Sequence, residues 1–199
     1  MRFRDELTFG IPLLRDVIDR TEILDAPDGA YTAFSDGDAH ITFYQRKDNY
    51  FRIMDLEMPF NPPDSQLSSF AQALSWLLSS LSGLEFLGIE YRNRTLDWQQ
   101  GAENGEWMEF LRPFVAVKDL ALGKELVLPV ASTLQDLVGE QVMEFLPALQ
   151  NILLKSDSSS PVPEGIGEFI AARELSGRPV VVHHGMRSSC GIKYFPGGR

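Results

Sequence analysis

Apolar residues recur in a short pattern that appears four times along the chain. Each copy has an apolar residue, two free positions, an apolar residue, one free position and a third apolar residue. The copies are Ile53–Met58, Leu84–Ile89, Val117–Leu122 and Leu149–Leu154, and successive copies start 31, 33 and 32 residues apart. A near-constant period of this size, with one short apolar strand in each unit, is typical of a leucine-rich-repeat-like solenoid. The alternative is four unrelated buried strands of an ordinary α/β domain, which would also be apolar.

Helical periodicity connects these strands. Between the first two copies, apolar residues from Leu67 to Leu81 repeat at helical spacing and predict the longest helix, over 65–81. Shorter helices are expected around Trp107 and after Pro129, and a last helix carries Ile166, Phe169, Ile170 and Leu175 before a closing strand at Val180–Val182. The pattern therefore predicts an α/β solenoid, with a mainly parallel sheet on one side and helices on the other.

The region before the first copy has a different pattern. Residues 11–18 fit a helix, and two β-rich runs at 31–35 and 40–44 flank Asp36-Gly37-Asp38, which predicts a β-hairpin. A calcium loop is not favoured here, because the twelve-residue spacing with a closing glutamate is absent. We expect an irregular N-terminal cap containing the hairpin, a single domain over 1–186, and a disordered tail over 187–199.

Charge and composition narrow the classes of partner. The formal net charge of −10 comes without a basic stripe, which argues against nucleic acid and favours a basic partner. Cys190 is the sole cysteine, so neither an intrachain disulfide nor a multi-cysteine zinc site can form. No signal-peptide-like segment and no apolar run near the ~20 residues of a membrane span occurs. We expect an intracellular protein, cytoplasmic or nuclear, that does not bind membranes.

Candidate chemistry is sparse. His183 and His184 are adjacent, so on a strand they point to opposite faces and cannot hold one metal ion together, and His40 is far away in sequence. Glu103 and Glu106 could act as an acid–base pair, which defines the alternative hypothesis of a small hydrolase or transferase. No other constellation stands out. The favoured prediction is a protein without catalytic activity, cofactor or metal.

The second half of the chain resembles a known family. The segments that carry the likeness are Trp107–Lys118, Leu134–Glu140, Val142–Leu149 and Phe169–Val180. They resemble the C-terminal half of the F-box and leucine-rich-repeat-like proteins of mushroom-forming fungi, closely over residues 107–183 and loosely elsewhere. In that family an N-terminal F-box binds the Skp adaptor of a cullin ubiquitin ligase, and the repeat region is presumed to hold the protein to be ubiquitinated.

The chain departs from this family in two places. No F-box-like helical segment precedes the first repeat, and the segment from Arg187 to Arg199 is unlike the usual family ending. The resemblance therefore implies either a fragment of a ligase receptor or a free-standing recognition domain. A Skp-type adaptor is an expected partner only if an F-box lies upstream.

The repeat pattern also predicts a binding face. If the apolar first, fourth and sixth positions point inward, the third and fifth positions point outward on an exposed sheet face. The predicted protein-binding residues on this face are Asp55, Glu57, Phe86, Asp119 and Asn151, with Glu90 and Lys155 continuing two of the rows. Gly88, Ala121 and Leu153 lie between them. This row is mildly acidic around an apolar centre, so we expect a basic or mixed protein segment as the partner.

Overall fold

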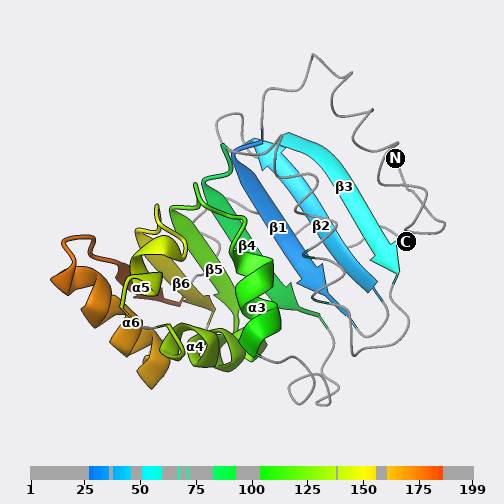
Figure 1. Cartoon of the computed structure of the whole chain (residues 1–199). Coiled ribbons are helices and arrows are strands. Elements are labelled where there is room, and N and C mark those ends of the chain that lie inside the picture. The colour runs from blue at the N-terminus through cyan, green and yellow to red at the C-terminus, as the bar shows by residue number, and fades with distance from the viewer. Residues whose placement is uncertain are drawn as a thin grey trace.

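The chain forms a mixed α/β structure around one sheet, seen in a computed structural model (Figure 1). The structure describes residues 27–35, 38–45, 51–59, 67, 71, 83–92, 104–137, 139–155 and 161–185. The helix predicted at 11–18, the acidic turn residue Asp36 and the tail at 187–199 lie outside these ranges. Of the helix predicted at 65–81, only Leu67 and Ala71 are described, and both are helical and buried.

The sheet has seven strands in the order β3-β2-β1-β4-β5-β6-β7. Its strands are β1 (Gly29–Phe34), β2 (Asp38–Gln45), β3 (Phe51–Pro59), β4 (Phe86–Tyr91), β5 (Asp119–Gly123), β6 (Asn151–Lys155) and β7 (Val181–His184). β1, β2 and β3 are joined in antiparallel pairs, whereas β1, β4, β5, β6 and β7 follow one another in parallel. The prediction of a mainly parallel sheet in an α/β fold is thereby confirmed.

The described helices cover one face of the parallel part of the sheet (Figure 1). They are α3 (Asn104–Leu111), the 3₁₀ turn η3 (Lys124–Leu126), α4 (Val127–Gln135), α5 (Gln141–Glu144) and α6 (Glu164–Leu175). Helix ends coincide with residues that cannot continue a helix. Pro113 follows α3, and Gly139 and Gly177 take positive φ of 57° and 74° after α4 and α6.

Three of the four predicted repeat copies lie side by side in register. Phe86, Asp119 and Asn151, each the third residue of its copy, pair across β4, β5 and β6. The first, fourth and sixth positions point inward and are at most 2% exposed: Leu84, Leu87, Ile89, Val117, Leu120, Leu122, Leu149, Ile152 and Leu154. The apolar pattern therefore predicted both the strands and the direction of their side chains correctly.

The placement of the first copy, Ile53–Met58, was wrong. It lies in β3, at an edge of the sheet, where it pairs with β2 in an antiparallel arrangement. The strand beside β4 is instead β1, the first strand of the predicted hairpin. The β1 residues that pair with the inward Leu87 and Ile89 are Ala30 and Thr32, both fully buried. Because these are small or polar rather than large and apolar, the leucine-like pattern did not detect them. The hairpin itself is confirmed as β1 and β2. Its first strand, β1, belongs to the parallel series, whereas β2 and β3 extend the sheet in antiparallel pairs.

A backbone hydrogen-bond pattern repeats where β4, β5 and β6 begin. The carbonyl of Asp28 accepts hydrogen bonds from the amides of Glu85 and Phe86, at 2.9 and 3.0 Å. The carbonyl of Glu85 accepts in the same way from residues 118 and 119, at 2.7 and 3.1 Å, and that of Lys118 from residues 150 and 151, at 2.8 and 2.9 Å. Asp28 thus has the role in β1 that Glu85 and Lys118 have in the next two strands. This shared pattern identifies β1 as the first of the parallel series.

The core lies between the sheet and the helices. Phe34 of β1 contacts Trp107 and Phe110 of α3 edge-on, with ring centroids 6.3 and 5.9 Å apart, and Trp107 is fully buried. On α6 the buried face carries Ile166, Phe169 and Arg173. Leu175, predicted on that face, is 90% exposed. The helix was predicted correctly, but a cation fills the core position one turn after Phe169.

Candidate binding face of the sheet

The face of the sheet opposite the described helices, called the outer face here, is lined by alternate residues of all seven strands. Strand register defines its rows. One row runs Tyr44, Gly29, Phe86, Asp119, Asn151 and Val181; the next runs Asp55, Thr42, Tyr31, Gly88, Ala121, Leu153 and His183. A third row contains Glu57, His40, Ala33, Glu90, Gly123 and Lys155. The outer face therefore carries a mixed set of aromatic, small and charged side chains.

All seven predicted binding residues lie on the outer face, but not all are close neighbours. Asn151 donates its amide to Asp119 at 2.7 Å, and Lys155 pairs with Glu90 at 3.0 Å. Asp55 and Glu57 lie on β3, separated from β4 by β2 and β1. Asp55 and Phe86 are therefore not neighbours, because residues 53–58 lie in β3 and not beside β4.

Two tyrosine rings lie across glycines of neighbouring strands. A Cβ added at Gly29 would lie 2.3 Å from the Tyr44 ring, and one added at Gly88 would lie 2.5 Å from the Tyr31 ring. Each glycine pairs directly with the tyrosine that covers it. Because only glycine leaves room for a ring at these positions, the aromatic groups can lie flat on the sheet.

Phe86 has the predicted orientation but is not exposed. Its side chain is 4% exposed and lies 6.2 Å from the Tyr44 ring, in a small cluster with Ala121, Tyr31 and Leu153. The expectation of a solvent-exposed phenylalanine was therefore wrong. Phe86 stabilises the outer face from within, so its removal would disturb the fold as well as any contact with a partner.

Side chains from three separate strands meet at Lys155. Its ammonium group donates to the Tyr31 hydroxyl at 2.9 Å and to Glu90 Oε2 at 3.0 Å, and it lies 5.0 Å from the centroid of the Tyr31 ring. Burial of Glu90 acts to raise its pKa, but the hydrogen bond from Tyr31 and the charge of Lys155 outweigh burial and hold the pKa below its ordinary value. The three groups form one compact ionic and aromatic cluster.

Further polar contacts continue across the outer face on both sides of this cluster. His183 Nε2 lies 3.2 Å from Asn151 Oδ1, which extends the Asn151–Asp119 hydrogen bond to β7. On the other side, Thr42 donates to Asp55 at 2.7 Å, and His40 lies 3.5 Å from the same carboxylate oxygen. The polar side chains of the outer face are thus largely pre-positioned by neighbours on adjacent strands.

The charge of the outer face is predominantly negative. Its described carboxylates are Asp55, Glu57, Glu90 and Asp119. Glu90 pairs with both Lys155 and Arg92, at 3.0 and 3.5 Å, so the described carboxylates still outnumber these two cations. Carboxylates held by hydrogen bonds or ion pairs favour a cationic ligand, because it adds charge complementarity without new side-chain ordering.

The residues considered for catalysis or metal binding do not assemble in the described structure. Glu103 lies outside the described residues, and Glu106 lies in the first turn of α3, on the helix side of the sheet. His40 on β2 and His183 on β7 are separated by β1, β4, β5 and β6. The described residues contain no group of three or more His, Cys, Asp or Glu side chains that could hold a metal ion. In the same part of the chain, no helix is both long and apolar enough to cross a bilayer.

Comparison with known proteins found no matching protein-family model, no similar curated protein and no similar solved structure. The structure defines the class of the protein, which is an α/β protein whose described helices cover one face of a mostly parallel sheet. Its outer face is the candidate site.

The repeat pattern does not include several residues that lie on the outer face. They are Tyr31, His40, Thr42, Tyr44 and His183. Four of them belong to the hairpin strands, whose alternation of residues was visible but was assigned to a cap. Placing that hairpin in the same sheet would have put their side chains in rows with Phe86 and Glu90.

Proposed function

We propose that this chain is a non-catalytic recognition domain that binds a basic protein segment on the outer face of its sheet. The observation that carries the proposal is the shared orientation of seven residues from β3, β4, β5 and β6 on the face opposite α3, α4, α5 and α6. Sheets covered by helices on one side commonly use the other side for binding in repeat proteins.

The repeat character of the fold belongs to the same proposal. Three units, each a strand followed by helical structure, place Phe86, Asp119 and Asn151 at intervals of about one period, and a double hydrogen bond to a backbone carbonyl recurs where each strand begins. These features support a leucine-rich-repeat-like solenoid. Together with the resemblance to fungal F-box proteins, they favour a role like that of a substrate-recognition region, and a Skp-type adaptor would require an F-box elsewhere.

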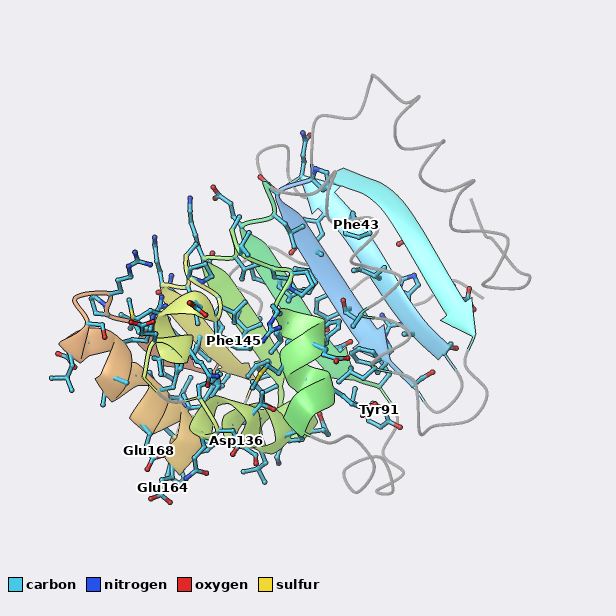
Figure 2. All side chains as sticks on the ribbon, viewed as in Figure 1. Phe43, Tyr91, Asp136, Phe145, Glu164 and Glu168 are labelled. Atoms are coloured by element: carbon cyan, nitrogen blue, oxygen red, sulfur yellow. The ribbon has the colours of Figure 1, made fainter. Side chains whose placement is uncertain are left out.

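Charge reversal on the two faces gives a matched test. Linear peptides that bind the whole chain would first be selected from a display library. The affinities of the selected peptides would then be measured by fluorescence anisotropy. Glu57→Lys with Asp119→Lys reverses two charges on the outer face. Glu164→Lys with Glu168→Lys makes the same change on α6, where Figure 2 shows both residues in the helix layer. Both pairs shift the net charge equally.

We expect selected peptides to be rich in lysine or arginine. The outer-face pair should weaken their binding about tenfold or more, and the α6 pair by less than about threefold, because complementary charge acts mainly at short range. Equal losses for the two pairs, or selected peptides without basic residues, would contradict the proposal. Thermal denaturation of each variant verifies that the comparison is made between folded proteins.

A further inference from the structure

Lys155 reaches across the sheet to contact residues that are not on neighbouring strands. It belongs to β6, whereas Glu90 is on β4 and Tyr31 is on β1, so its side chain passes over β5. The β5 residue in this row is Gly123, where an added Cβ would lie 3.0 Å from Glu90 Cα. The absence of a side chain at Gly123 leaves the path between Lys155 and Glu90 open.

The groups around the ammonium are of the kind that recognise a cation. The Tyr31 ring presents a π-face 5.0 Å from Nζ, the Tyr31 hydroxyl accepts at 2.9 Å, and the Glu90 carboxylate supplies the counter-charge at 3.0 Å. Tyr31 and Glu90 are also hydrogen-bonded to each other. Because the Glu90 and Lys155 side chains are 13% and 22% exposed, the ammonium is partly desolvated but can be reached from solvent.

We propose that Tyr31 and Glu90 form an ammonium-binding subsite of the outer face, which Lys155 occupies in the free chain and a lysine side chain of the partner occupies in the complex. This inference rests on the proposed function for the identity of the incoming group. The chemistry of the subsite itself rests on Tyr31 and on Glu90 Oε2, because Arg92 Nε lies 3.5 Å from the other carboxylate oxygen, Oε1.

Internal occupancy makes binding an exchange of one ammonium for another. The partner can use the subsite only in the fraction of molecules in which Lys155 has moved away, so the apparent affinity is lowered by that fraction. Removing the Lys155 ammonium should therefore leave the subsite vacant and strengthen the binding of a lysine-containing segment.

The first experiment uses a small cation in place of the partner. Lys155→Ala removes three methylene groups and the ammonium, and n-propylammonium replaces the same atoms. The thermal midpoint of Lys155→Ala should rise by about 2–4 °C when n-propylammonium is present at several times its dissociation constant. The wild-type chain should show no such rise, since its subsite is filled. Lys155→Thr, which retains strand propensity, replaces Lys155→Ala if the latter does not fold.

Matched controls isolate the carboxylate and the charge. The rise should be absent in Lys155→Ala with Glu90→Gln, and absent when 1-propanol or sodium chloride replaces n-propylammonium. An equal rise in the wild-type chain, in the Glu90→Gln double variant or with 1-propanol would overturn the subsite, because the effect would then not depend on a vacant, charged site.

The second experiment connects the subsite to the partner, with tetralysine amide as the probe. Lys155→Ala should bind it about three- to tenfold more tightly than the wild-type chain. Lys118→Ala is the control, because Lys118 forms a similar ion pair with Glu85 at 2.6 Å and its removal changes the net charge equally. Equal strengthening by both variants would show a general charge effect and overturn the exchange.

The two experiments separate this inference from the proposed function. Rescue by n-propylammonium without any binding of tetralysine would establish the subsite and count against the basic-segment surface. Tetralysine binding that depends on Glu57 and Asp119, without rescue by n-propylammonium, would support the surface and overturn the subsite.

Discussion

Arg173 occupies a core position of α6 that helical periodicity assigns to an apolar side chain. It is fully buried, and its guanidinium donates to the carbonyls of Val142, Pro147 and Leu149, at 3.4, 3.3 and 3.1 Å. Burial, and secondarily the charge of Arg178, lowers the pKa of Arg173. Within the described residues no carboxylate pairs with it. The side chain therefore serves to satisfy carbonyl groups of α5 and of the segment between α5 and β6.

Substitution of Arg173 tests this role. Arg173→Lys should lower the free energy of unfolding by about 2–3 kcal/mol, since a compact ammonium cannot reproduce the fork of donors and leaves buried carbonyls unpaired. Arg178→Lys is the control, because Arg178 is exposed and makes one long hydrogen bond of 3.4 Å to Pro147; we expect a change within about 0.5 kcal/mol. Urea denaturation measures both. Equal effects would show that Arg173 has no special role in closing this segment.

Glu90 predicts a dependence of stability on pH. Its pKa in the folded chain lies below the ordinary value of 4.5, because Tyr31 and Lys155 outweigh the effect of burial. A carboxyl group with a lowered folded pKa stabilises the fold above its unfolded pKa, and this contribution is lost as pH falls through the folded pKa. The stability difference between wild type and Glu90→Gln should therefore be full above about pH 5 and shrink in more acidic solution. A difference that grows on acidification would have the wrong sign.

At the scale of elements, α6 packs against α4 through a glycine. A Cβ added at Gly165 would lie 2.1 Å from the carbonyl oxygen of Ala131, so α6 would have to move away. Gly165→Ala should destabilise the chain by about 1–3 kcal/mol. Gly167 lies two residues further along α6, and a Cβ added there would have nothing within 4 Å, so Gly167→Ala should stabilise the chain by up to about 1 kcal/mol through helix propensity. Thermal unfolding of the two variants gives the comparison, and destabilisation by both would contradict the packing argument.

Sequence periodicity predicted elements well where the inward positions were large and apolar. Leu84, Val117 and Leu149 begin three copies that became β4, β5 and β6 with their predicted register. It failed for β1, because Ala30 and Thr32 stand where the copies have Leu87 and Ile89, and long-range pairing then placed β1 where β3 was expected. Local pattern determines which side of a strand faces inward, whereas the partner of a strand depends on contacts distant in sequence.

The outer face shows the same division. Residues at alternate positions of β4, β5 and β6 could be assigned to one face from spacing alone, and the predicted neighbours Glu90 and Lys155 continue those rows. The contribution of Tyr31 could not be predicted, since it depends on β1 lying beside β4 and on Gly88 leaving space for the ring. The contacts between side chains at the site thus depend on the order of strands in the sheet, which sequence periodicity does not predict.

For the whole molecule, strand order predicts where the fold is most protected. β1 and β4 have neighbours on both sides and lie in the interior of the sheet, whereas β3 and β7 end the described strand order. Amide hydrogen exchange should be slowest in β1, β4 and β5 and faster in β3 and β7, because edge strands open at lower free energy. Exchange in β1 as fast as in β7 would contradict the position of β1 as an interior strand.

The double hydrogen bond to a carbonyl that recurs at the starts of β4, β5 and β6 has a consequence for how the protein can vary in evolution. Asp28, Glu85 and Lys118 each satisfy the next strand through a backbone oxygen, and their side chains differ in length and in sign of charge. Since any residue supplies that oxygen, the alignment of strands places little demand on the side chain. Mutations at Asp28, Glu85 or Lys118 can therefore change the charge at one end of the sheet while the strands keep their register. Recognition can then diverge between descendants of the same fold.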